Sequence, residues 1–339
     1  MTATGAREGF SGTVGETPLI RIKSLSEQTG CTILAKAEHL NPGGSIKDRA
    51  ALAIIDAAEK SGALPAGGGG LIVEGTAGNT GIGLTLVAAA RGHRCSIVMP
   101  SNQSEEKISL LRTLGADVEL VPPAPFKDPK NYYPVARAKA EATPNAFWAN
   151  QFENPANAEA HYTTTGPELW RQTGGKIDGV IMSSGTGGTI GGVTAYLKEL
   201  RSTIRTALID PPGSGLYSWV KKGVFETSGS SITEGIGIMR ETANFRRARL
   251  DDAFFGSDRE TVEMAHYLLK HDGLFVGSSA ALNCVGAVKL ARAMGPGKVI
   301  VTMLCDGGGR YQSRLFGAAW LADKGLTPKA VGLEFVESP

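Results

Sequence analysis

One lysine stands at a position where its amine can do chemistry. Lys47 follows the turn Asn41-Pro42-Gly43-Gly44 and begins an apolar-periodic helix. A lysine held on a rigid element beside a glycine turn loses solvation, so its amine can act as a nucleophile and form Schiff bases with carbonyl groups. Most lysines near a helix start are instead solvated surface charges. The choice between these interpretations depends on the rest of the chain.

A glycine–threonine loop supplies the first further indication. The run Gly185-Thr186-Gly187-Gly188-Thr189 follows the apolar segment 180–182 and precedes a predicted helix. Backbone N–H groups, hydroxyls and the helix N-terminus in such a loop converge on one anion, although a plain strand–helix turn would use similar residues. Neither a Walker A sequence nor a G-x-G-x-x-G fingerprint occurs in the chain. A small phosphorylated cofactor therefore fits better than a nucleotide.

A second loop, Glu74 to Gly81, also follows a predicted strand and opens a helix. Its N–H groups and threonine hydroxyls suit a carboxylate, while Asn79 can donate a hydrogen bond to a phenolic oxygen. An ordinary strand–helix turn explains this loop equally well when it is considered alone.

Strand and helix patterns alternate along most of the chain. We predict strands over 32–37, 71–74, 96–99, 118–121, 180–182, 207–209 and 299–304. We predict helices over 45–60, 80–90, 104–114, 192–200, 259–270 and 279–294. This alternation predicts an α/β fold of doubly wound parallel sheets, which bind ligands where loops follow the carboxyl ends of strands. Segment 122–134 is expected to be a surface excursion, and segment 240–252 a solvated surface.

Composition narrows the class of protein. The 339 residues suggest two domains, and a net charge of +2 argues against nucleic-acid or membrane-surface binding. The four cysteines are widely spaced, with no C-x-x-C pair, which argues against a metal cluster or a disulfide framework. No signal peptide and no membrane span are predicted. We therefore expect a cytoplasmic protein without a metal site.

Several motifs occur together in a recognisable order. Besides the two loops and the Lys47 turn, they are Thr17-Pro18-Leu19, Gln151-Phe152-Glu153-Asn154-Pro155-Ala156-Asn157 and His161-Tyr162-Thr163-Thr164-Thr165-Gly166-Pro167-Glu168. From about Thr13 to Arg314 the chain resembles the cysteine synthase (O-acetylserine sulfhydrylase) and cystathionine β-synthase family of fold-type II pyridoxal-phosphate (PLP) enzymes. That resemblance implies a tryptophan synthase β-like fold, with two doubly wound open-sheet domains and PLP in the cleft between them. The smaller domain would span residues 43–152, and the larger one 12–42 plus 153–325.

The resemblance also implies roles for individual residues. Lys47 would be the catalytic lysine that forms the Schiff base with PLP and later moves the α-proton. The other implied cofactor ligands are Asn79, Gly185, Thr186, Gly187, Gly188, Thr189 and Ser279, the last facing the pyridine nitrogen. The implied substrate-binding residues are Thr76, Ala77, Gly78, Thr80, Gln151 and Gly235.

The implied reaction is β-replacement on an O-activated serine, with cysteine synthesis from O-acetylserine and sulfide as the leading expectation. The family is usually homodimeric. The chain departs from the family pattern at four places, namely Ala77, Pro122–Tyr133, Ile238–Thr242 and the run from Cys305 to Tyr311. We expect these departures to affect the substrate side and to leave the cofactor side intact.

Other functions remain open at this point. A different donor or nucleophile would give cystathionine or a non-proteinogenic alanine derivative, and β-elimination would make the enzyme a lyase or deaminase. A catalytically inactive binding protein is disfavoured because Lys47 and the phosphate loop are both present. A nicotinamide oxidoreductase is disfavoured by the missing glycine fingerprint.

Overall fold

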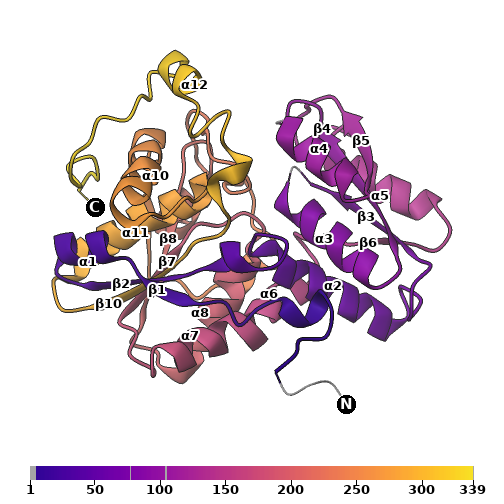
Figure 1. The fold of residues 1–339 in the computed structure, drawn as a ribbon, viewed down its shortest axis with the longest axis horizontal. Coiled ribbons are helices and arrows are strands. Elements are labelled where there is room, and N and C mark those ends of the chain that lie inside the picture. Colours follow the sequence, from indigo (N-terminus) through magenta and orange to yellow (C-terminus); the bar gives the residue numbers. More distant parts are fainter. Residues whose placement is uncertain (1–4, 77, 104, 339) are drawn as a thin grey trace.

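The computed structural model describes residues 5–76, 78–103 and 105–338. Its described strands form two sheets, and each sheet is the centre of one lobe (Figure 1). The lobe that contains β3 to β6 lies on the right of that view, and the lobe that contains β1, β2 and β7 to β10 lies on the left.

The four-stranded sheet is parallel throughout, in the order β5-β4-β3-β6. Its strands are β3 (Leu71–Gly75), β4 (Arg94–Pro100), β5 (Asp117–Val121) and β6 (Ala146–Trp148). Successive residues of a strand face opposite sides. Ile72 thus packs in the core formed with α2 (Lys47–Ser61), α3 (Asn79–Ala90) and α4 (Glu105–Thr113), whereas Val73 packs against α5 (Tyr132–Ala142).

The six-stranded sheet has the order β1-β2-β10-β7-β8-β9. Its strands are β1 (Leu19–Arg21), β2 (Thr32–Lys36), β7 (Gly179–Met182), β8 (Arg205–Asp210), β9 (Asp252–Phe255) and β10 (Val299–Met303). One face packs on α1 (Lys23–Thr29), α10 (Asp258–Asp272), α11 (Ser278–Met294) and α12 (Ala318–Asp323). The other face packs on α7 (Gly166–Gln172), α8 (Gly188–Leu200) and α9 (Leu216–Lys222).

This architecture confirms the predicted α/β fold, because both sheets carry helices on both faces. Helix α6 (Ala156–Ala160) contacts α2 of one lobe and α8 of the other, and so lies between them (Figure 1). In the described ranges, no helix is both long and apolar enough to cross a bilayer.

Three strands were missed by the sequence patterns. β1, β6 and β9 contain only three or four residues each, too few to show a period, and their pairing with β2, β3 and β8 defines them. The expectation of purely parallel sheets is wrong at β1, which pairs antiparallel with β2.

Two segments that we expected at the surface are more ordered than predicted. Helix α5 begins inside the 122–134 segment, where Asn131 caps it by accepting a hydrogen bond from Tyr133 N at 3.0 Å. Pro134 fits in the first helical turn, because backbone N–H groups there have no intrahelical partner. In segment 240–252, Thr242 and Asn244 are fully buried.

Candidate active site

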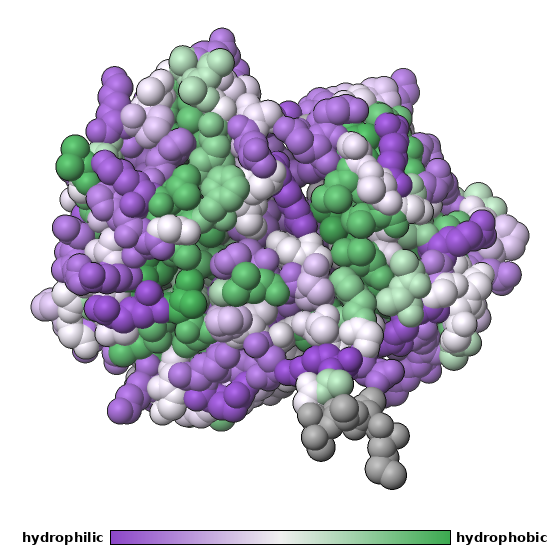
Figure 2. Space-filling view, in the orientation of Figure 1, coloured by the Kyte–Doolittle hydropathy of each residue, from purple (hydrophilic) through white to green (hydrophobic). Residues whose placement is uncertain are grey.

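A cavity of about 800 Å³ opens between the two lobes. Figure 2 shows the surface hollowed between them on one face of the molecule. Ten of the residues assigned from the sequence line this cavity, and they are Lys47, Thr76, Gly78, Asn79, Thr80, Gln151, Gly185, Thr186, Gly235 and Ser279. A smaller adjoining cavity is lined by Lys47 and by residues 183–190, which include Gly187, Gly188 and Thr189. Ala77 lies outside the described residues.

Lys47 is the first residue of α2 and lines both cavities. The turn before it is fixed because Asp48 accepts a 2.6 Å hydrogen bond from Gly43 N, and Ile46 N donates to Cys305 O at 2.9 Å. Within the described ranges, the Lys47 amine has no hydrogen-bond or ion-pair partner. Burial lowers the pKa of Lys47, although the nearby Cys305 and Asp306 oppose this shift. This shift favours the neutral amine that nucleophilic and base chemistry requires.

The loop before α8 forms a polar cradle. Gly187 has φ +86° and is the N-cap of α8, so the first backbone N–H groups of the helix have no intrahelical partner, and residues 187–190 line the smaller cavity. The hydroxyls of Ser183 and Ser184 are buried there and find no hydrogen-bond partner in the described part of the chain. Unpaired buried hydroxyls beside a helix N-terminus suit the phosphate of a cofactor.

Three side chains outside the cradle hold it in shape. Asn157 Nδ2 donates to Thr186 Oγ1 at 3.0 Å, and Thr242 Oγ1 donates to Thr186 O at 2.8 Å. His161 lies in a single π-helical turn (residues 161–165), and its Nε2 is 3.2 Å from Thr189 Oγ1. Burial lowers the pKa of His161 to about 3, so the imidazole is neutral. The motifs around Asn157 and His161 therefore support the loop at 185–189.

Gly188→Ala is expected to weaken PLP binding by at least 10-fold. A Cβ at Gly188 would stand 2.0 Å from Asn157 Oδ1, which displaces the side chain that holds Thr186. The measurement is a PLP titration of apoprotein. Gly12→Ala is a matched control, because its Cβ would meet no atom closer than 3.5 Å. Unchanged PLP affinity in Gly188→Ala would contradict the assignment of the cradle.

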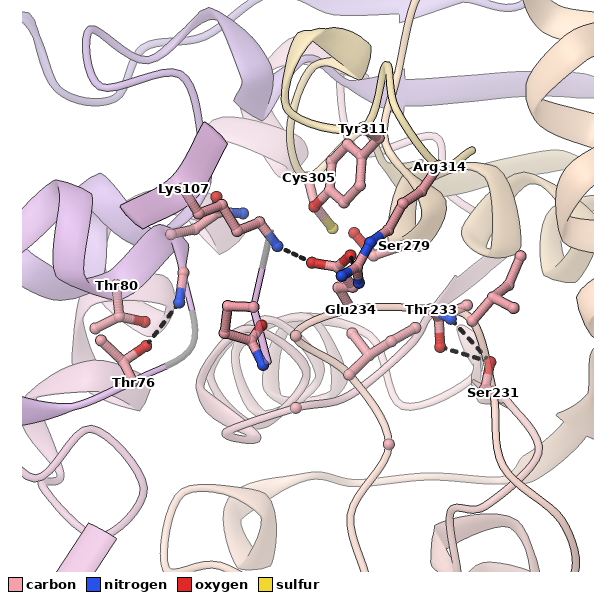
Figure 3. A pocket seen from close by; sticks show the side chains of 18 of the residues that line it. Thr76, Thr80, Lys107, Ser231, Thr233, Glu234, Ser279, Cys305, Tyr311 and Arg314 are labelled. Atoms are coloured by element: carbon pink, nitrogen blue, oxygen red, sulfur yellow. Dashed lines mark hydrogen bonds and ion pairs between the residues drawn. The ribbon is translucent and has the colours of Figure 1, made fainter. Parts of the chain in front are cut away.

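Ser279 and Cys305 lie on the larger-lobe side of the main cavity (Figure 3). Ser279 is in the first turn of α11, and Cys305 comes shortly after the end of β10. Burial raises the pKa of Cys305 to about 11, although Lys47 and the Ser279 hydroxyl oppose the shift. A protonated thiol and a neutral hydroxyl therefore face this part of the cavity at neutral pH, with no negative charge from either.

The smaller lobe presents Thr76, Thr80 and Gln151 to the cavity. Thr80 Oγ1 donates a 2.6 Å hydrogen bond to Gln151 Oε1. Beneath this loop, burial raises the pKa of Glu74 to about 8, although the nearby Gln151 and Asn150 oppose this shift. The Glu74 carboxyl is thus mainly neutral at pH 7 and does not repel an anionic ligand on the loop.

An ion-pair group crosses the cavity between the lobes. Lys107 on α4 pairs with Glu234 of the larger lobe, and Arg314 Nη1 lies 3.2 Å from the other oxygen of Glu234. Figure 3 shows Lys107 and Glu234 pointing toward one another across the cavity. One carboxylate therefore joins two cations at the rim, which leaves one net positive charge there.

Arg240 binds a carboxylate of the protein itself. Its guanidinium pairs with Glu153 and lies 4.7 Å, 5.3 Å and 5.8 Å from the ring centres of Phe126, Phe152 and Tyr133. Two segments that depart from the family pattern, 122–133 and 238–242, thus contact each other. Arg240 is neither a free surface charge nor an open carboxylate receptor.

The helix that carries Lys47 is anchored by a buried ionic network. Arg49 donates to Glu38 at 2.7 Å and to Glu168 at 2.6 Å, and Lys36 Nζ lies 2.6 Å from Glu168 Oε2. These four side chains are at most 5% exposed. Because Glu38 follows β2 and Glu168 is on α7, the network ties α2 to the larger lobe.

Glu168→Gln is expected to flatten the acid limb of the stability curve. Burial opposes ionisation of Glu168, but Arg49 and Lys36 lower its pKa to about 2 from 4.5. A lowered folded-state pKa stabilises the protein above pH 4.5, and this contribution is lost as the pH falls toward 2. Urea unfolding between pH 6 and pH 3 measures the slope. An unchanged slope in the variant would contradict the ionised pair.

The sequence patterns did not single out every important residue. Asn157, His161, Thr242 and Asp306 contact the predicted cofactor residues Thr186, Thr189 and Asn79. Two of them, Thr242 and Asp306, belong to segments expected to affect the substrate side, yet they contact residues predicted for the cofactor side. The sequence signal that could have identified them is a polar, uncharged or acidic residue within an otherwise charged or glycine-rich stretch. Among the described residues, no group of three or more His, Cys, Asp or Glu side chains could hold a metal ion.

Similarity to known proteins agrees with this geometry. Residues 10–306 match the family model described as pyridoxal-phosphate dependent enzyme. A cysteine synthase of Dictyostelium discoideum is 51% identical over 94% of this chain and 87% of its own length. Cysteine synthase 1 of Neurospora crassa is also 51% identical, over 96% of this chain and 87% of its own length.

More distant relatives include cystathionine beta-synthases. That of Apis mellifera is 38% identical over 92% of this chain and 62% of its own length. The crystal structure of an O-acetylserine dependent cystathionine beta-synthase from Helicobacter pylori superimposes with a TM-score of 0.81 at 33% identity, covering 90% of this chain and 97% of that one. With Lys47, the polar cradle and the interlobe cavity in place, the chain belongs to the pyridoxal-phosphate-dependent enzyme family.

Proposed function

We propose that this enzyme makes cysteine from O-acetylserine and sulfide by PLP-dependent β-replacement. The observation that carries the proposal is the convergence of Lys47, the loop at 76–80 and the cradle at 183–189 on two adjoining cavities. Cysteine synthases about 50% identical over nearly the whole chain support the choice of donor and nucleophile.

Different residues of the chain would bind different parts of the cofactor. The cradle at 185–189, with Ser183 and Ser184, would hold the cofactor phosphate, Asn79 its phenolic oxygen and Ser279 its pyridine nitrogen. Bound PLP supplies an electron sink for the charge left when the α-proton is removed. Because Ser279 and Cys305 are both neutral, neither enforces a protonated ring, which favours loss of the β substituent over deeper carbanion chemistry.

The substrate would bind mainly to residues of the smaller lobe. Thr76, Ala77, Gly78, Thr80 and Gln151 would hold the substrate carboxylate, with Gly235 on the opposite side of the cavity. The neutral carboxyl of Glu74 beneath the loop avoids repulsion of that anion. Lys47 would take the α-proton on its Nζ and return it after the nucleophile adds, a role that suits an amine whose pKa is lowered by burial.

The direct test is a two-step addition to purified holoenzyme. O-acetylserine should change the visible absorption of the bound cofactor, and sulfide should restore it as cysteine appears. A cofactor absorption that does not change when O-acetylserine is added would contradict the proposal for this donor. Pyruvate release from serine, threonine or cysteine, without cysteine synthesis, would assign a lyase instead.

A second candidate is β-replacement with a thiol that carries its own carboxylate, which would give cystathionine. Two observations favour it, the structural similarity to the Helicobacter pylori enzyme and the net positive charge at the Lys107–Glu234–Arg314 rim. Competition between sulfide and homocysteine for the donor-loaded enzyme separates the two. Cystathionine formed faster than cysteine at equal concentrations would reverse the order of the candidates.

We also propose the assembly, compartment and domain limits expected from the sequence. A homodimer in the cytoplasm agrees with the usual state of the family, and sedimentation and fractionation test these two points. A smaller domain at 43–152 agrees with the strands of the four-stranded sheet, while 12–42 and 153–325 hold those of the six-stranded sheet. Because the chain passes between the two parts near both residue 42 and residue 152, limited proteolysis is expected to release the smaller domain only when it cuts at both places.

A further inference from the structure

Asp306 lies where three segments of the active site meet. It follows β10 and is completely buried. Its backbone pairs with Ser45, two residues before Lys47, and its carbonyl accepts from Gly277 N at 3.1 Å, just before Ser279. Its side chain reaches the smaller lobe, where Oδ2 accepts a 2.8 Å hydrogen bond from Asn79 Nδ2. Asp306 thus connects the predicted lysine, phenolic-oxygen and pyridine segments.

The contacts of Asn79 fix which way its amide points. Nδ2 donates to Asp306, while Oδ1 accepts from Arg310, which also donates to Gly43 O. A carboxylate only accepts and a guanidinium only donates, so the reversed amide would lose both hydrogen bonds. An amide nitrogen has two N–H groups, and the second has no partner within the described ranges. Asn79 lines the main cavity, so this N–H is available there.

The carboxylate itself has little freedom to move. Tyr311 OH donates to Asp306 Oδ2 at 2.5 Å. Gly277 is required on the other side, because a Cβ there would stand 2.2 Å from Asp306 Oδ1. The position of the acceptor is therefore set by Tyr311, by the missing side chain of Gly277 and by the backbone.

We propose that Asp306 is a positioning residue, which with Arg310 locks the Asn79 amide so that its free N–H faces the cofactor. This inference rests on the proposed role of Asn79 at the phenolic oxygen. It places a functional side chain in the segment Cys305–Tyr311, which departs from the family pattern. Since Asn79 and Asp306 come from different lobes, the amide is locked only when the lobes are together.

A double-mutant cycle tests the coupling. Asn79→Ala and Asp306→Ala should each raise the Kd for PLP about 5- to 10-fold, roughly 1–1.4 kcal/mol, and the double variant should be no worse than Asn79→Ala. The cofactor absorption of both single variants should shift in its pH dependence by the same amount. Asp306→Asn keeps an acceptor oxygen and should stay within about 2-fold of the parent.

The controls separate the possible failures. If the losses of PLP affinity in the two single variants multiply in the double variant, the inference is overturned, but the proposed role of Asn79 is not. An unchanged Kd in Asn79→Ala would overturn the role of Asn79 and the inference with it. Asp210→Asn is a matched control, because Asp210 is equally buried, also has one unpartnered oxygen and lines neither cavity. If Asp306→Ala does not fold, the double-mutant cycle is measured with Arg310→Met and Asn79→Ala instead. Multiplied losses of PLP affinity in that double variant would likewise overturn the inference.

Discussion

Replacing Lys47 with alanine is expected to lower kcat/KM by about 10³-fold or more. Lys47 lines both cavities, and burial lowers its pKa toward the range where a neutral amine can attack a carbonyl or take a proton. Proton transfer by one positioned side chain contributes typically about 10²–10⁴-fold. The loss of the covalent attachment adds to that effect.

Borohydride reduction shows where the cofactor attaches. In the parent protein, reduction with PLP present should label the peptide that contains Lys47, and the Lys47→Ala variant should lose this label. Lys60→Ala is the matched control, because Lys60 lies on the same helix but is exposed to solvent. Its activity and labelling should equal those of the parent. A label elsewhere, or turnover within 10-fold of the parent in Lys47→Ala, would contradict the assigned role.

Replacing Arg49 with methionine is expected to destabilise the protein by about 3–5 kcal/mol, the usual cost of breaking a buried ion pair from one side. Methionine fills similar space but leaves the Glu38 carboxylate without its guanidinium and Glu168 with only Lys36. Arg49 is on α2, two residues after Lys47, so activity should also fall in the folded variant.

Urea unfolding of parent and variant measures this effect. Arg137→Met serves as the control, because Arg137 forms an exposed pair with Glu141 on α5, and such pairs contribute less than about 1 kcal/mol. Equal losses in the two variants would show that the buried network contributes no more than a surface pair. A destabilised Arg49→Met with unchanged kcat would show that the network stabilises α2 without positioning Lys47.

The local patterns of the sequence predicted the fold class correctly and marked most of the candidate cofactor residues. The alternation of apolar strands and amphipathic helices was sufficient for a doubly wound α/β architecture, because period and turn residues are local properties. Lys47 and the loop at 185–189 were also recognisable as candidates, since the residues that mark each of them are adjacent in the chain. Short strands such as β6 were not recognisable, because three residues carry no period.

Long-range contacts were decided by the tertiary structure alone. Arg240 lies in a segment expected to be a solvated surface, and only the fold brings it to Glu153 and three aromatic rings. Asp306 and Asn79 are 227 positions apart, so no local pattern links them. The sequence by itself determined which chemistry the chain can perform. The packing of the lobes determined which side chains orient that chemistry, because orientation depends on partners that are distant along the chain.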